Sequence, residues 1–99
     1  MSSTQARYQA SSLKAFRELL AAWLGTIPLE GWEGGTAELE DSLERTKAKR
    51  RLRGRVPKSN GLGIRIRSEV PFLEAHGFAL EFYRTAKART IRVYPANSV

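Results

Sequence analysis

The stretch "SNGLGIRIRSEVPFLEAHGFALEFYRTAKARTIRVYP" (residues 59–95) changes its hydrophobic period once, and the change falls at Gly77. Before Gly77, four apolar residues follow one another at spacings of four, four and three, which is typical of one buried helix face. These residues are Leu62, Ile66, Val70 and Leu73. The stretch therefore predicts a helix that starts at Ser59 and ends at His76. Pro71 removes a backbone donor, so we expect a kink or a restart between Glu69 and Pro71.

Beyond Gly77 the hydrophobic period is two, which is typical of strands with one buried face. The alternation covers two runs, 80–83 and 91–94, and the basic loop "TAKAR" (85–89) separates them. The pattern predicts a β-hairpin, followed by a short C-terminal tail over residues 95–99.

Two further helices are expected before this stretch. The first starts near Ser11 or Ser12, either of which can cap exposed backbone N–H groups, and it ends at Gly25. Its apolar residues recur at helical spacing, and they are Leu13, Phe16, Leu20 and Trp23. Residues 1–10 are polar and unpatterned, so we predict a flexible N-terminal tail there.

The second helix is expected over residues 37–46, because Thr36 can cap it and the acidic residues of its first turns suit the helix dipole. The glycine-rich segment before it allows only a very short strand around Trp32. Three helices followed by a two-stranded hairpin wing is the order of the winged helix-turn-helix, an α+β fold. We therefore predict one winged-helix domain over residues 11–94.

The size and composition of the chain narrow the class of protein. A chain of 99 residues forms one domain on size grounds, and the lack of cysteine excludes disulfides, thiol catalysis and zinc fingers. The longest apolar run, "LLAAWL" (19–24), is too short to span a bilayer, and the first ten residues lack the apolar core of a secretory signal. We expect a soluble, cytoplasmic protein of a bacterial or phage-infected cell, with no membrane partner.

Signatures of catalysis are also missing from the sequence. The segment "GLGIRIR" (61–67) has no Lys-Ser/Thr pair after its glycines, so it is not a phosphate-binding P-loop. The ten carboxylates show no metal-binding spacing, and the single histidine, His76, is expected at a helix end. We predict a non-enzymatic binding domain with no catalytic residue, no metal and no cofactor.

The charges are segregated along the chain, whose net charge is +7. Residues 30–44 contain six acidic residues and no basic one, whereas residues 45–67 contain ten basic residues and no acidic one. This density favours a phosphate-rich partner, nucleic acid ahead of an anionic membrane, and the alternative is a solvated, flexible linker. Because Gly54 and Pro57 break any long helix, we predict a mobile basic arm over residues 47–57 that follows the phosphate backbone of DNA.

Candidate DNA-binding residues come from this arm, from the start and outer face of the helix at Ser59, and from the hairpin loop. They are Arg50, Arg51, Arg53, Arg55, Lys58, Ser59, Asn60, Ile64, Arg65, Arg67, Ser68, Arg84, Lys87 and Arg89. Arg67 and Asn60 are the best candidates for contacts with base edges, and Ile64 is suited either to a thymine methyl group or to a partner protein.

Three stretches, "WEGGTAELEDSLE" (32–44), "PKSNGLGIRIRSEVPFLEAHGFALEFYRT" (57–85) and "RTIRVYP" (89–95), resemble the C-terminal winged-helix domain of phage- and mobile-element-type primase–helicase ATPases. The matching positions are Trp32, Thr36, Ala37, Leu39, Pro57, Lys58, Ser59, Leu62, Gly63, Arg65, Ile66, Arg67, Pro71, Gly77, Glu81, Phe82, Arg89, Thr90, Ile91 and Arg92. One departure is Glu69, which stands where a Leu is usual in the pattern, so Val70 is expected to take over its packing role.

The resemblance implies double-stranded DNA binding in the replication of a phage, plasmid or other mobile element. Origin or replication-fork DNA, and a replicative helicase or primase, are the partners that it implies.

Other functions fit the same residues. A transcription regulator of a mobile element would need a dimer to bind two half-sites, and no heptad or extra apolar helix is visible for one. A protein–protein interaction module would use Ile64 and the acidic segment 30–44. RNA is a further candidate partner. Tyr83 and Tyr94 share the outward face of the hairpin, where stacking on a nucleotide is the less favoured role.

Overall fold

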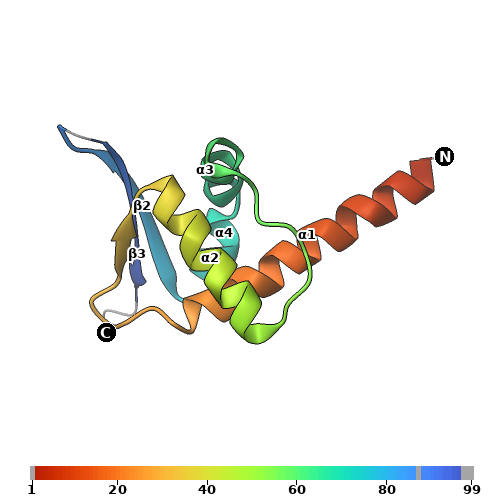
Figure 1. Cartoon of the computed structure of the whole chain (residues 1–99), viewed down its shortest axis with the longest axis horizontal. Helices are drawn as coiled ribbons and strands as arrows, with labels where there is room; N and C mark the ends of the chain where they lie inside the picture. Colours follow the sequence, from red (N-terminus) through yellow and green to blue (C-terminus); the bar gives the residue numbers. More distant parts are fainter. Residues whose placement is uncertain (1, 87, 97–99) are drawn as a thin grey trace.

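Four helices and three strands make up the part of the chain that the structure describes. The computed structural model describes residues 2–86 and 88–96, with side chains from residue 13 onward except that of Ser59. In chain order the elements are α1 (Ser2–Leu24), β1 (Trp32–Gly34), α2 (Thr36–Arg50), α3 (Ser59–Ser68), α4 (Val70–Ala75), β2 (Phe78–Arg84) and β3 (Arg89–Pro95). The sheet lies at one side of the helices, and the first half of α1 extends away from the rest of the molecule (Figure 1). The predicted α+β class is confirmed.

The central strand of the sheet is β3, which is also the last element in the chain order. The strands are arranged β1-β3-β2, and both pairings are antiparallel. Leu80 of β2 and Trp32 of β1 both lie opposite Val93, on the two sides of β3. Val93 and Ile91 are buried, so the period of two correctly predicted the inner face of this strand. The short strand predicted around Trp32 joins the hairpin in one three-stranded sheet.

The core lies where the inner face of the sheet meets the helices. Its buried apolar side chains are Phe16, Leu19, Leu20, Trp23, Leu24, Leu39, Leu43, Val56, Leu62, Ile66, Leu73, Ile91 and Val93. The indole N–H of Trp23 donates a hydrogen bond to Oγ of Ser42 (2.8 Å), and its ring meets the ring of Trp32 edge-on, with the centroids 5.4 Å apart. Trp23 thereby ties α1 to both α2 and β1.

Glu69 separates α3 from α4. Its N–H donates the last hydrogen bond of α3, and its carbonyl accepts the first hydrogen bond of α4. Pro71 follows in the first turn of α4, where backbone N–H groups have no partner within the helix, so proline costs no helical hydrogen bond there. The carboxylate is buried, with 2% of the residue exposed, and it accepts two hydrogen bonds from Arg17, at 2.9 and 3.0 Å. The restart predicted at residues 69–71 is confirmed. An ion pair occupies the place of the usual Leu, while Val70 is only half-buried.

The expected N-terminal tail is helical instead. Helix α1 begins at Ser2, well before the cap predicted at Ser11 or Ser12, so the tail over residues 1–10 is wrong for residues 2–10. No Gly or Pro interrupts residues 2–24, and a Ser inside a helix costs only about 0.5 kcal/mol relative to Ala. At the other end β3 continues through Pro95, one residue into the predicted C-terminal tail, and residues 97–99 lie outside the described part.

Helix α2 runs to Arg50, beyond the end predicted at Thr46. Its last residues are good helix formers, and cations there interact favourably with the helix dipole. Arg51 then adopts the left-handed conformation (φ 53°), and the N–H of Leu52 donates to the carbonyl of Lys47 at 3.0 Å. This is a Schellman cap, in which the apolar residue after the turn packs back, and Leu52 does pack against the core.

The remainder of the basic segment lies along α1. Val56 is buried, and the backbone at Gly54 approaches Ala15 so closely that a Cβ at Gly54 would lie 2.9 Å from the Cβ of Ala15. Gly54 also has a φ of 106°, which favours glycine. The arm predicted over residues 47–57 is therefore not separate from the fold: residues 47–50 belong to α2, and Leu52 and Val56 pack against the core.

Candidate nucleic-acid interface

A groove of about 840 Å³ lies between α3 and the hairpin of β2 and β3. Helix α3 has its buried residues, Leu62 and Ile66, on one side and presents the opposite side to the groove. Ile64 is 75% exposed there. The lining residues are Thr36, Asn60, Gly63, Ile64, Arg67, Phe82, Tyr83, Arg84, Arg89, Thr90 and Ile91. The groove thus gathers residues of α2, α3 and both hairpin strands.

The floor of the groove is apolar and continues the core. Phe82 and Ile91 lie opposite each other on the inner face of the hairpin, which faces α3. The guanidinium of Arg67 lies over the Phe82 ring, with its carbon atom 4.2 Å from the ring centroid, which is close enough for a favourable cation–π contact. The sequence had not indicated Phe82 as the support of Arg67, because the two come from separate elements.

The far end of the groove carries two arginines that face each other. Arg84 and Arg89 are directly opposite in the register of β2 and β3, two positions beyond the pair Phe82 and Ile91. Both are exposed, and no described carboxylate forms an ion pair with either of them. Like charges at directly opposite positions of an antiparallel pair are destabilising. An anion bound between the two guanidinium groups would remove that repulsion.

The structure brings five of the predicted DNA-binding residues into this groove, and they are Asn60, Ile64, Arg67, Arg84 and Arg89. Lys58 is exposed and directly precedes the first residue of α3. The side chain of Ser59, and Lys87 as a whole, lie outside the described residues. The periodicity of α3 was enough to identify this face.

Arg65 was predicted at the flank of the DNA-binding face, and it turns out to face α1. Its guanidinium carbon lies 5.1 Å from the centroid of the Phe16 ring, and its Nε is buried with no hydrogen-bond partner. Arg65 directly precedes the core residue Ile66, so it lies beside the buried stripe of α3. Ser68 is exposed, and its hydroxyl donates to the carbonyl of Arg65 at 2.7 Å, inside the last turn.

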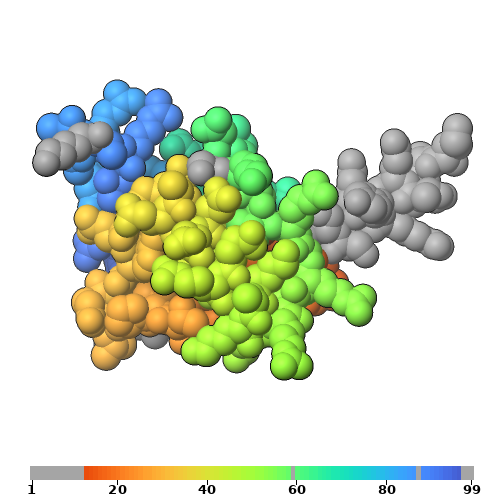
Figure 2. All heavy atoms as spheres, viewed as in Figure 1, coloured from red at the N-terminus to blue at the C-terminus, as the bar shows by residue number. Residues whose placement is uncertain are grey.

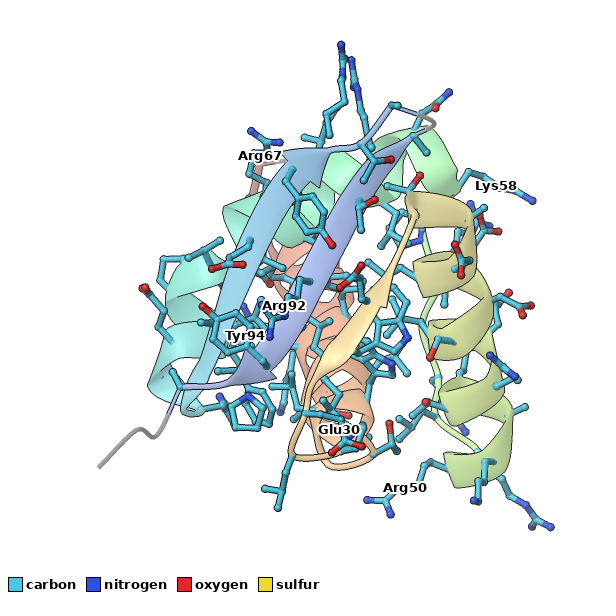
Figure 3. All side chains as sticks on the ribbon, turned by 90° about the vertical axis from the view of Figure 1, so that its left-hand side faces the viewer. Glu30, Arg50, Lys58, Arg67, Arg92 and Tyr94 are labelled. Carbon is cyan, nitrogen blue, oxygen red and sulfur yellow. The ribbon has the colours of Figure 1, made fainter. Side chains whose placement is uncertain are left out.

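Arg50, the first of the four arginines predicted in the basic arm, lies at the other end of the molecule. Figure 3 shows Lys58 and Arg67 at one end and Arg50 at the opposite end. Thr36, the first residue of α2, lines the groove, whereas Arg50 ends that helix, about 21 Å away at 1.5 Å per residue. The arm was expected beside the face of α3. It cannot lie there, because α2 continues through the first part of the segment. The other three are Arg51, Arg53 and Arg55, all exposed.

On the outer face of the sheet, away from the helices, polar and charged side chains contact one another. The Tyr94 hydroxyl donates to Oε2 of Glu81 at 2.9 Å, and Arg92 lies over the Tyr94 ring and 3.9 Å from Glu81. Hydrogen bonds to Glu81 and to Glu33 raise the pKa of Tyr94 and of Tyr83 respectively. Carboxylates on this face repel phosphate, which disfavours a nucleic-acid contact there.

His76 and the carboxylates form no further site in the described part of the chain. Nδ1 of His76 is 3.0 Å from the Phe72 carbonyl, and the two rings lie 4.4 Å apart at the end of α4. Among the described residues there is no group of three or more His, Cys, Asp or Glu side chains that could hold a metal ion. None of the helices in that part is both long enough and apolar enough to cross a membrane.

Comparison of the chain with protein-family models, with curated proteins and with solved structures finds no match in any of the three.

Proposed function

We propose that this chain is a double-stranded DNA-binding module of the winged-helix type. In this proposal α3 enters the major groove, and the loop between β2 and β3 is the wing that lies along the sugar–phosphate backbone. The observation that carries the proposal is the groove itself, in which Asn60, Ile64 and Arg67 of α3 meet the facing pair Arg84 and Arg89.

The order of elements supports the proposal. A helix, a short strand, three helices and a hairpin follow one another, and the short strand pairs with the last strand. Helix α4 is an addition to the expected three-helix plan, and it results from the break at Glu69. An α-helix fits the major groove of B-form DNA, and an exposed face of α3 beside a cationic hairpin has the shape required.

Each groove residue has a chemical role in this proposal. Arg84 and Arg89 neutralise phosphates on the two sides of the wing, and Lys58 neutralises one near the start of α3. Asn60 and Arg67 carry side chains that form paired hydrogen bonds with adenine and guanine edges. Ile64 offers an apolar contact for a thymine methyl group. Phosphate contacts supply most of the affinity, and α3 supplies any sequence preference.

The biological setting follows from the sequence resemblance alone. A chain similar to the C-terminal domain of primase–helicase ATPases would act in the replication of a phage, plasmid or other mobile element. It would direct a replicative helicase or primase to origin or fork DNA.

A competition experiment tests the proposal. Fluorescence anisotropy at about 50 mM salt should show the wild-type chain binding a labelled duplex of about 20 base pairs, because few counterions then compete. Unlabelled duplex should displace it at lower concentration than single-stranded DNA or RNA of the same sequence. No binding at this salt, or displacement by RNA first, contradicts the proposal.

One observation favours a second candidate, a protein–protein interaction module. Ile64 is 75% exposed at the centre of the groove, and an exposed apolar side chain there also suits a partner protein. The substitution Ile64→Ala separates the candidates. It should change the preference among duplex sequences if α3 contacts bases, and it should leave all duplex binding untouched if the groove serves a protein.

A further inference from the structure

The end of α2 farthest from the groove and the segment that follows it carry a second group of cations. This group, the α2-end cluster, consists of Lys49, Arg50, Arg51, Arg53 and Arg55. All five residues are exposed, and none forms an ion pair with a described carboxylate. In Figure 2 long side chains of this segment project from the lower end of the molecule. The cluster is a dense positive surface without a partner inside the described chain.

The helical part of the cluster, Lys49 and Arg50, lies at the end of α2 opposite to the groove. Helix α2 measures about 21 Å from Thr36, which lines the groove, to Arg50. Between these ends α2 carries four carboxylates, Glu38, Glu40, Asp41 and Glu44. Arg45 lies 3.8 Å from Asp41 and Lys47 lies 4.0 Å from Glu44, while Glu38 caps the helix by accepting the Gly35 N–H. A phosphate backbone that ran along α2 from groove to cluster would meet this acidic stretch.

The backbone holds the cluster in place. The Schellman cap fixes the turn at Arg51, Leu52 and Val56 pack against the core, and Gly54 lies against α1 at Ala15. Arg53 and Arg55 are the immediate neighbours of Gly54, so both extend from a segment that the core anchors. Cations on an anchored segment lose less conformational entropy on binding than cations on a free arm.

We propose that the α2-end cluster binds the phosphate backbone of a second DNA segment, so that one chain holds two duplexes together. The proposal rests on the proposed function for the first segment, which the groove binds. The high charge density of a duplex is the complement of five cations within seven consecutive residues, whose binding releases condensed counterions. The acidic stretch of α2 keeps the two duplexes on different surfaces.

A bridging experiment tests this inference. A biotinylated duplex of about 20 base pairs is held on streptavidin beads, the chain is added, and capture of a second, fluorescent duplex is measured at about 50 mM salt. The wild-type chain should capture the second duplex. Arg50→Ala/Arg53→Ala should still bind the first duplex but should capture the second at least about fivefold less, since each lost contact weakens binding severalfold.

The matched control removes the same charge elsewhere. Lys14 and Arg45 are exposed and lie outside both the groove and the cluster, so Lys14→Ala/Arg45→Ala should capture like the wild-type chain. Thermal melts of both double variants establish that they are folded. Equal losses in the two variants would mean that net charge alone drives capture, and they would overturn the proposal.

Other outcomes discriminate between the two proposals. The second surface is overturned if the cluster variant captures the second duplex as well as the wild-type chain does. It is also overturned if the wild-type chain binds one duplex but captures no second one. Neither outcome contradicts binding of the first duplex in the groove. If Arg84→Ala/Arg89→Ala binds the first duplex as tightly as the wild-type chain, the proposed function fails instead.

Sedimentation of the DNA-free chain completes the test. The chain should sediment as a monomer. A dimer that the cluster variant abolishes would assign the cluster to the acidic face of α2 in a second copy, and it would overturn the proposal.

Discussion

The buried Glu69 carboxylate is held by the guanidinium of Arg17, which reaches from α1 to the junction of α3 and α4. The two groups lie far apart in the sequence, and their hydrogen bonds are 2.9 and 3.0 Å long. The pair raises the pKa of Arg17 through the hydrogen bond with Glu69. A charged pair is therefore built into the place where α3 ends.

Arg17→Ala should lower the melting temperature, because it leaves a buried carboxylate without its partner. Arg17→Met/Glu69→Leu should recover most of the loss, since apolar side chains of similar size often replace a buried ion pair without cost. Thermal melts followed by circular dichroism measure both, with the exposed Lys14→Ala as the control. Equal melting temperatures for Arg17→Ala and Lys14→Ala would show that the pair is not structural.

Two isoleucines on α3 should differ widely in their response to the same substitution. Ile66 is fully buried, so Ile66→Ala should lower the free energy of unfolding by about 2–5 kcal/mol through the cavity it leaves. Ile64 is 75% exposed, so Ile64→Ala should change it by less than about 0.5 kcal/mol. Urea unfolding measures both. A larger loss of unfolding free energy for Ile64→Ala than for Ile66→Ala would mean that the buried face of α3 is assigned to the wrong side of the helix.

Arg51→Gly should stabilise the fold by about 1 kcal/mol. Arg51 has a φ of 53°, and a left-handed conformation costs a residue with a Cβ about 1–2 kcal/mol that Gly avoids. The neighbouring Arg50→Gly is the control, because Gly inside the last turn of α2 should destabilise it by about 1 kcal/mol. Urea unfolding of the two variants should give free-energy changes of opposite sign. Changes of the same sign would contradict the left-handed conformation of Arg51 at the end of α2.

Stability should fall above pH 10 because of the outer face of the sheet. Tyr83 and Tyr94 both have a pKa raised above the ordinary value of 10, chiefly by hydrogen bonds to Glu33 and Glu81. A raised pKa means that the folded state holds the proton more tightly, so this contribution is complete below pH 10 and is lost as the pH rises through the folded-state pKa.

Absorbance at the tyrosinate band should therefore show a component that titrates above pH 10, and Tyr83→Phe/Tyr94→Phe should remove it. The same variant should lose less stability than the wild-type chain between pH 9 and pH 11 in thermal melts. A tyrosinate titration with a single midpoint at 10 would contradict the hydrogen bonds.

Removing the facing arginines should make duplex binding less dependent on salt. Each phosphate contact contributes about 0.9 to the slope of log affinity against log salt, so Arg84→Ala/Arg89→Ala should reduce the slope by up to about 1.8. Loss of the like-charge pair should leave the melting temperature unchanged or raise it. Anisotropy titrations at several salt concentrations give the slope, and Lys14→Ala/Arg45→Ala should leave it at the wild-type value.

The hydrophobic pattern predicted the elements that bury one regular face. The spacing of Leu62, Ile66 and Leu73 located α3 and α4, and alternation around Ile91 located the hairpin. The loop predicted over residues 85–89 would have placed Arg84 opposite Thr90, whereas β3 begins at Arg89, which pairs with Arg84. The outer face of α3 followed from the same periodicity, and five of the predicted DNA-binding residues do line the groove.

The errors fall where local signals and tertiary contacts disagree. Ser11 and Ser12 looked like caps, but nothing after them in α1 requires the helix to start there. The basic segment looked free because it has few apolar residues, yet Leu52 and Val56 suffice to anchor it once α1 lies beneath. Arg65 could be assigned only when Phe16 was known to lie beside it, and no spacing within α3 contains that information.

The position of β3 at the centre of the sheet makes folding depend on pairing between distant parts of the chain. Trp32 and Phe82 belong to the two outer strands, which pair only with β3 in the sheet, so neither strand has a hydrogen-bonded neighbouring strand until residues 89–95 are in place. During synthesis the helices can form early, whereas the sheet must wait for the last strand to leave the ribosome. Such late, long-range pairing slows folding, and a chain cut after Arg84 would expose two unpaired strand edges and aggregate.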